Sequence, residues 1–223
     1  MQHDFLDENQ IRQSVSRFHY DVAQAILETV ELSVDAKLNI LSAVLLLQQG
    51  LAIHDDVDTV SVRCRQLSVL AGDYNSSQYY YLLARIADGD LLMHLSRAVI
   101  QVNEAKMAIL NTPSLSAERY LNLHMQIQGS LLVALAQRFL PPSGGWKQEI
   151  DSLVKAYIVQ GELSTRNVPK NFTLRQGYEW LTETMERILV SSSAMSPLYN
   201  VVVDYLYPMK KSMENVTFAE GNH

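Results

Sequence analysis

The residues best suited to chemistry are three carboxylates, Asp55, Asp56 and Asp58, which follow a long apolar segment. A helix over that segment would end beside them, where its dipole already places partial negative charge. A cation would relieve the repulsion, and Mg²⁺ is typically held by one or two carboxylates together with substrate phosphates. Arg63 and Arg65 follow closely and are suited to charge-assisted hydrogen bonds with diphosphate oxygens. The pattern indicates a magnesium and diphosphate site or its remains; the alternative is a solvated acidic helix end followed by a basic turn.

The elements that would position this cluster are helices. Apolar residues recur mostly three and four positions apart, and Gly and Pro residues gather between such segments, which predicts an all-α protein. Ser33 is a suitable N-cap for a helix that is apolar over most of its circumference, so we expect this helix to be central. The predicted helices cover residues 9–32, 33–55, 67–86, 90–110, 116–139, 147–163, 178–191 and 198–213.

Length, charge and composition exclude several classes of protein. The 223 residues suffice for a single helical domain over 1–223, with a core over 1–140 and C-terminal helices over 146–223. Eighteen basic residues against 24 acidic ones give a net charge of -6 without a basic stripe, which disfavours nucleic acid as a partner. Cys64 is the only cysteine, and we find neither a signal peptide nor an apolar run long enough to span a membrane. We expect a soluble, cytoplasmic protein.

Four short strings carry a resemblance to a known family. LAIHDDVD, RCR, VLAGDY and VNEAK stand in the same order as in the N-terminal half of the trans-prenyltransferases, the all-helical enzymes that elongate allylic diphosphates with isopentenyl diphosphate. The order fits over residues 38–131. The resemblance implies an antiparallel helical bundle of the isoprenoid synthase type, in truncated form. It also implies that Asp55, Asp56 and Asp58 are vestiges of a magnesium-binding motif, and Arg63 and Arg65 of a diphosphate-contacting pair.

The sequence departs from that family at the positions that carry catalysis. Thr59 stands where the family has the third aspartate of its DDxxD motif, and Ile127 and Gln128 stand where it has a diphosphate-holding Lys-Thr pair. After position 100 the only aspartates are Asp151 and Asp204, so the second aspartate-rich motif, which would complete the metal site, is missing. Departing diphosphate would lose most of its electrostatic stabilisation. The chain alone is therefore predicted to be inactive and to bind no metal or other cofactor.

A helical scaffold that lacks a metal site is similar to the small, non-catalytic subunits of heterodimeric synthases, the heptaprenyl diphosphate synthase component 1 family of Gram-positive bacteria. The resemblance implies a catalytic partner, component 2, which carries two DDxxD motifs, binds Mg²⁺ and uses farnesyl and isopentenyl diphosphates. It also implies that the small subunit is required for activity and for product length in menaquinone side-chain synthesis. We therefore expect a heterodimer in which this chain is regulatory.

The family dimer is built largely from the two helices that follow the first aspartate-rich motif, here those predicted over 67–86 and 90–110. The resemblance therefore implies an interface made of Tyr74, Tyr79, Tyr80, Leu83, Leu91, Leu95, Ala98 and Val102. The run from Tyr79 to Tyr81 supports this, because three consecutive aromatic residues cannot all face one core and tyrosine is favoured at interfaces. The alternative is that these residues cover a neighbouring helix of the same chain.

Product length suggests a further role for the helix over 90–110. In the family, the growing chain occupies an apolar tunnel that runs toward the dimer interface and stops elongating when it meets a floor. Met93, Met107 and Leu110 are candidates for that floor, because methionine adapts to flexible apolar ligands. The alternative is that they are ordinary core residues.

Two other functions compete with the subunit hypothesis. A divergent active isoprenoid synthase or terpene cyclase would need a second metal site, and no N-x-x-x-S-x-x-x-E pattern occurs on a late helix. An unrelated helical protein-binding module would make the LAGDY string a coincidence. That module would be a stable monomer that ignores prenyl diphosphate synthases.

Overall fold

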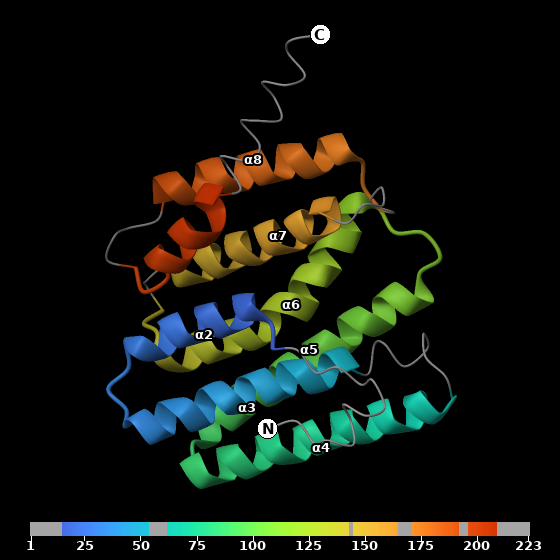
Figure 1. Ribbon diagram of the computed structural model, residues 1–223. Coiled ribbons are helices and arrows are strands. Elements are labelled where there is room, and N and C mark those ends of the chain that lie inside the picture. Colours follow the sequence, from blue (N-terminus) through green and yellow to red (C-terminus); the bar gives the residue numbers. More distant parts are fainter. Residues whose placement is uncertain (1–14, 54–61, 143–144, 165–170, 192–195, 209–223) are drawn as a thin grey trace. The chain divides into compact units, whose positions relative to one another are not determined.

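The structure is a computed structural model that describes residues 15–53, 62–142, 145–164, 171–191 and 196–208 (Figure 1). Throughout these ranges the regular elements are helices, which confirms the predicted all-α fold. They are α2 (Arg17–Glu28), α3 (Val34–Ile53), α4 (Val62–Ile86), α5 (Gly89–Asn111), α6 (Ala117–Phe139), α7 (Trp146–Ser164) and α8 (Leu174–Ser191). Residues 199–208 form a further helix, which carries no label in Figure 1.

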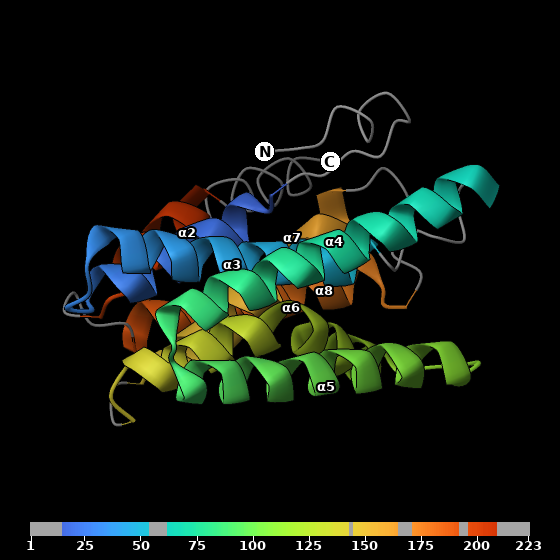
Figure 2. The ribbon, with the colours of Figure 1, turned by 90° about the horizontal axis from the view of Figure 1, so that it is seen from below.

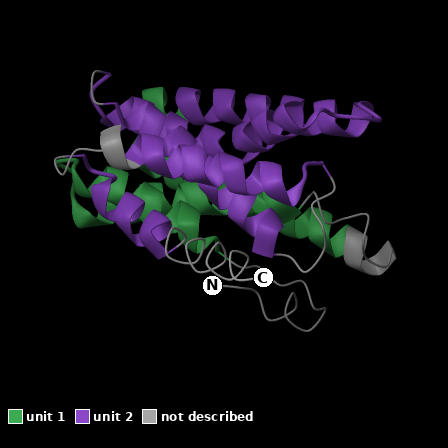
Figure 3. Cartoon of the chain, turned by 90° about the horizontal axis from the view of Figure 1, so that it is seen from above, with its two compact units in different colours: residues 1–92 green, residues 93–223 purple. Residues whose placement is uncertain are grey.

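The chain forms two compact units, Met1–Leu92 and Met93–His223 (Figure 3). The division falls in the first turn of α5 rather than in the Pro-Pro-Ser-Gly-Gly loop at 141–145, where the sequence predicts a change within one domain. The expected single domain stays a prediction.

In the first unit, α3 packs against both α2 and α4, and Figures 1 and 2 show α3 and α4 running side by side. The Ser33 hydroxyl accepts a hydrogen bond from the Ala36 amide at 3.2 Å, so Ser33 is the N-cap that the sequence predicts. Fully buried Ile40, Ala43 and Val44 lie on one face of α3. Within the first unit, α3 thus packs on both α2 and α4 and buries one apolar face.

Among the helices of the described ranges, α3 alone is long and apolar enough to cross a membrane, with a mean hydropathy of 1.4. One third of that segment, 33%, is buried inside the protein. The helix packs against α2 and α4. Length and composition alone do not distinguish a membrane-spanning helix from the core helix of a globular protein.

In the second unit, α7 packs against α6 and α8. Ser116 caps α6 by accepting a hydrogen bond from the Arg119 amide at 3.2 Å, and Leu131, Leu132 and Leu135 are buried on the same helix. The Trp146 indole donates to the Pro141 carbonyl at 2.9 Å, which ties the start of α7 to the loop before it. These contacts place α6, α7 and α8 in one apolar core.

Candidate functional site

The acidic cluster predicted to be a vestigial metal site, Asp55, Asp56 and Asp58, lies outside the described residues. The described part of α3 extends to Ile53, and the end that the sequence predicts near residue 55 lies outside the described residues. α4 begins at Val62 rather than at Leu67, so Arg63 and Arg65 belong to its first turn. The vestigial roles of these five residues stay predictions.

Within the described ranges, no group of three or more His, Cys, Asp or Glu side chains is placed to hold a metal ion. Asp151 lies on α7 and is half-buried; burial raises the pKa of its carboxyl group, and nearby Lys147 partly offsets this. Asp204 is exposed on the last helix. The two aspartates of the C-terminal half therefore have different surroundings.

An exposed apolar surface runs along α4, and we name it the α4 face. It consists of Val69, Leu70, Tyr74, Tyr80 and Tyr81. At about 100° per residue, Leu70, Tyr74 and Tyr81 fall within about 40° of one another, and Val69 and Tyr80 both lie roughly 80° to 100° from Leu70 on the same side. All except Val69 are more than half exposed. Two residues of the predicted interface, Tyr74 and Tyr80, thus lie on the protein surface.

The opposite side of α4 explains why this face points outward. Asn75 is buried, and its side-chain amide donates to the Gln49 amide oxygen of α3 at 3.3 Å. At Gly50 the two helices approach so closely that a Cβ would lie 3.3 Å from the Gly72 carbonyl oxygen. A polar contact and a close backbone approach therefore fix the rotation of α4 against α3.

The other six residues of the predicted interface are buried within the chain, and their role at an interface stays a prediction. These residues are Tyr79, Leu83, Leu91, Leu95, Ala98 and Val102. On α5 they recur at spacings of four and three, which is the pattern of a stripe that faces a core. A stripe that faces a partner has the same spacing, so periodicity alone does not separate the two.

A second exposed apolar surface lies on α5, and we name it the α5 stripe: Met93, Ile100, Met107 and Leu110. These side chains are 42%, 57%, 55% and 79% exposed. The alternative that Met93, Met107 and Leu110 are core residues is therefore wrong. Their proposed role as a tunnel floor stays a prediction, and Ile100 is a member that the sequence analysis missed.

The second unit contains a polar and aromatic cluster that the sequence analysis also missed. The Tyr120 hydroxyl of α6 donates to the Glu162 carboxylate of α7 at 2.7 Å, and burial and Glu162 both raise the pKa of Tyr120. The Tyr120 ring lies 4.2 Å from the His124 ring and 6.5 Å from the Phe172 ring, between centroids. These residues join α6 and α7 to the segment before α8. No sequence pattern links residues so far apart along the chain.

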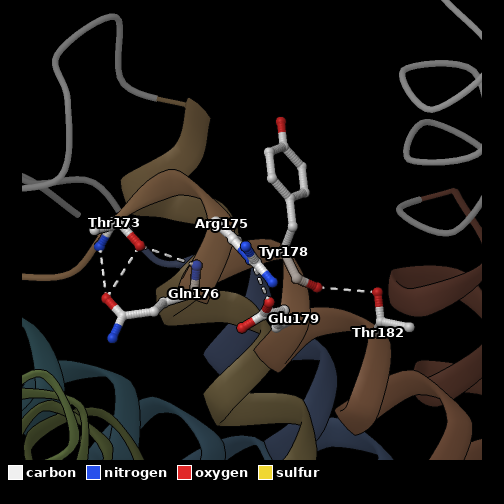
Figure 4. A network of polar contacts seen from close by, with 6 residues as sticks. All are labelled: Thr173, Arg175, Gln176, Tyr178, Glu179 and Thr182. Atoms are coloured by element: carbon white, nitrogen blue, oxygen red, sulfur yellow. Dashed lines mark hydrogen bonds and ion pairs between the residues drawn. The ribbon is translucent and has the colours of Figure 1, made fainter. Parts of the chain in front are cut away.

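Nearby, α8 is fixed at its start and along its buried side. Figure 4 shows that Thr173 and Gln176 form a reciprocal capping box, with the Thr173 amide donating to the Gln176 side chain at 2.9 Å. Trp180 packs on Phe172 at 5.2 Å, and the Lys155 ammonium lies 5.9 Å from the Trp180 ring. Burial lowers the pKa of Lys155. This arrangement is a packing cluster, and the exposed α4 and α5 surfaces remain the candidates for binding.

Comparison with known proteins identifies a family and a relative that match this chain. The family described as heptaprenyl diphosphate synthase (HEPPP synthase) subunit 1 matches residues 3–189. Heptaprenyl diphosphate synthase component 1 from Geobacillus stearothermophilus is 38% identical over 105 residues, which are 46% of this chain and 48% of that protein. The match thus spans about half the length of that relative.

A solved structure shares the fold. It is that of an isoprenoid synthase family member from Thermotoga neapolitana DSM 4359, with a TM-score of 0.66 and 14% sequence identity. The superposition covers 92% of this chain and 89% of that one. The predicted isoprenoid synthase type of helical fold is therefore confirmed.

Proposed function

This chain belongs to the heptaprenyl diphosphate synthase subunit 1 family, and we propose that it is the small, non-catalytic subunit of a heterodimeric polyprenyl diphosphate synthase. The observation that carries the proposal is the family match over residues 3–189. In this proposal a cytoplasmic catalytic subunit carries both aspartate-rich motifs, binds Mg²⁺ and extends farnesyl diphosphate with isopentenyl diphosphate. The product is a heptaprenyl diphosphate for the menaquinone side chain. The family match speaks against an unrelated binding module, and no observation favours a terpene cyclase.

The distribution of carboxylates supports the proposal that this subunit catalyses no prenyl transfer. A prenyltransferase clamps magnesium between two acidic clusters, and ionised carboxylates are the ligands that Mg²⁺ requires. Asp151 and Asp204 are the only aspartates after position 100. Burial disfavours the charged form of Asp151, and Asp204 lies exposed on another helix. Neither feature suits one half of a metal clamp.

The α4 face supports a contact with the catalytic subunit. Exposed tyrosines combine a large apolar ring with a hydroxyl that keeps hydrogen bonding at an interface, and they lose little conformational entropy on binding. Tyr74, Tyr80 and Tyr81 lie on one helix whose rotation is set by buried contacts with α3. We assign the main contact with the catalytic subunit to this face.

The α5 stripe supports a contact with the product chain. Its side chains carry no hydrogen-bonding group stronger than a thioether, and methionine adapts its shape to a flexible hydrocarbon. From Met93 to Leu110 the stripe is about 25 Å long at 1.5 Å per residue. We assign to it the far end of the tunnel in which the prenyl chain grows, so that this subunit limits product length.

Assembly tests the proposal. The full chain is mixed with the two-motif synthase subunit from the same genome, and the dissociation constant is measured by isothermal titration calorimetry. Leu70→Asp or Tyr74→Asp should weaken binding by about tenfold or more, because each places a charge in a buried interface. Tyr207→Asp, at an exposed tyrosine of the last helix, is the matched control and should bind like the unmodified chain. Absence of binding by the unmodified chain would sink the subunit hypothesis.

A further inference from the structure

Two members of the α5 stripe are methionines, whose thioethers an oxidant can convert to sulfoxides. Four of the eight methionines in the chain lie in the described ranges. Met93 is 42% exposed and Met107 is 55% exposed, whereas Met185 on α8 is only 5% exposed. The fourth, Met125 on α6, is half-buried. Oxidants dissolved in the solvent therefore reach Met93 and Met107 more readily than the other methionines that the structure describes.

Oxidation would change the polarity of the α5 stripe at these two positions. Hydrogen peroxide transfers one oxygen atom to the sulfur, which becomes a sulfoxide, and the rest of the peroxide leaves as water. The sulfoxide oxygen accepts hydrogen bonds, so covering it with a hydrocarbon leaves a buried acceptor without a donor. The other members of the stripe, Ile100 and Leu110, contain no sulfur and keep their apolar character. The stripe thus carries two sites at which an oxidant can switch an apolar surface to a polar one.

The surroundings of the two methionines allow the folded chain to accept this change. Arg97 follows Met93 by four residues and Asn103 precedes Met107 by four, and both polar side chains are exposed. Residues four apart are neighbours on a helix, so a guanidinium and an amide are available as donors to the two sulfoxide oxygens. At Met185 the oxygen would instead be enclosed in an apolar core. Oxidation at Met93 and Met107 therefore alters a surface and spares the fold.

We propose that Met93 and Met107 form a reversible oxidation site of the free subunit, with a peroxide as the oxidant. A methionine sulfoxide reductase reverses the reaction: two thiols are oxidised to a disulfide, the sulfoxide is reduced to the thioether, and its oxygen leaves as water. The exposed fractions of the two side chains set their reactivity, and their position on one apolar stripe gives the modification a defined target.

The consequence for synthesis rests on the proposed function. A sulfoxide at either position weakens the affinity of the α5 stripe for hydrocarbon, so a prenyl chain that grows against the stripe stops earlier. The heterodimer that contains an oxidised subunit then releases shorter products. A long prenyl chain lying on the stripe also shields both thioethers, which makes the free subunit the form that reacts. Product length thereby depends on the peroxide concentration.

Peroxide treatment of the full chain tests the modification. Peptide mass spectrometry follows the oxidised fraction of each methionine over time, and Met93 and Met107 should react about tenfold faster than Met185. The helical circular dichroism signal should persist while these two residues react. Methionine sulfoxide reductases A and B, supplied with a dithiol, should return both to thioethers. Equal rates at all three residues, loss of the helical signal, or sulfoxides that the reductases leave in place would overturn the proposal.

Product analysis tests the consequence for synthesis. The oxidised chain is mixed with the two-motif synthase subunit from the same genome, and its products are compared with those of the untreated chain by mass spectrometry. Oxidation should shift the products toward shorter chains, and reduction should restore them. In the double variant Met93→Leu with Met107→Leu, peroxide should not shift that variant's own product distribution, because leucine has a similar volume but no sulfur.

The outcomes separate the oxidation site from the proposed function. Products that keep their length although both methionines are oxidised would overturn the control of synthesis. A shift that persists in the double variant would overturn it too, and would place the effect at another residue such as Cys64. Absence of synthesis in the untreated mixture would overturn the proposed function, and the oxidation rates alone would then decide whether the site exists.

Discussion

The α4 face and the α5 stripe are both exposed and apolar, but they differ in chemistry. The α4 face contains three tyrosines, whereas the α5 stripe contains two methionines, an isoleucine and a leucine. Tyrosine hydroxyls need hydrogen-bonding partners, which a protein surface provides and a hydrocarbon does not. Thioether and aliphatic side chains impose no such requirement. The difference supports the proposal that two successive helices of the chain serve two kinds of partner.

The largest expected effect separates the two sides of α4. Tyr79→Ala should lower the free energy of unfolding by about 3 to 5 kcal/mol, because it removes a buried ring and leaves a cavity. Tyr80→Ala, the adjacent and exposed control, should cost about 1 kcal/mol or less, including its ring contact with Tyr79. Urea denaturation measures both. Equal costs at the two positions would mean that α4 is rotated from the orientation described above.

The next effect separates the two sides of α5. Leu95→Ala should cost about 3 kcal/mol of stability, because Leu95 is fully buried. Met93→Ala should cost about 0.5 kcal/mol or less and should instead shift the products of the heterodimer toward longer chains, since the tunnel floor becomes deeper. Mass spectrometry of the products measures the shift. An unchanged product distribution would remove Met93 from the floor.

A smaller effect concerns the contact that orients the α4 face. Asn75→Ala should cost about 1 to 2 kcal/mol, because it removes the hydrogen bond to Gln49 inside the helix pair. Ser77→Ala is the matched control on the exposed side of α4, where the cost should be about 0.5 kcal/mol or less. Thermal unfolding measures both changes. A neutral Asn75→Ala would show that apolar packing alone orients the helix.

The smallest effect lies in the second unit and depends on pH. Since the folded state raises the pKa of Tyr120, it binds the phenol proton more tightly than the unfolded state does. The free energy of unfolding should therefore fall as the pH rises above about 10, the usual tyrosine value. Tyr120→Phe should cost about 1 kcal/mol near neutral pH, and its deficit should shrink at alkaline pH. A deficit that is constant from pH 8 to 11 would contradict the raised pKa.

Local features of the fold were predictable from the sequence. Ser33 is the N-cap that its position before an apolar segment indicates, and α5 and α6 lie close to their predicted ranges. The start of α4 was predicted too late, because Arg63 and Arg65 looked like a turn, although arginine is a good helix former. The high helix propensity of these two arginines was the sequence signal for an earlier start of α4.

The candidate site was predictable only in part, for two physical reasons. Spacing identifies the apolar stripes of α5 but not which of them faces the core, so buried Leu95 was assigned to the interface and exposed Ile100 was overlooked. Contacts across the chain, such as that of Tyr120 with Glu162, depend on tertiary packing and leave no local pattern. Identifying the family's helical scaffold required neither kind of information, because its strings follow one another along the chain.

The central claim is that this chain supplies no chemistry of its own and is nevertheless needed for it. The direct test measures prenyl diphosphate synthesis from farnesyl and isopentenyl diphosphates with Mg²⁺ in three samples: this chain, the two-motif synthase subunit from the same genome, and their mixture. The account predicts a long-chain product only in the mixture. Turnover by this chain alone, or full activity of the synthase subunit without it, would contradict the account.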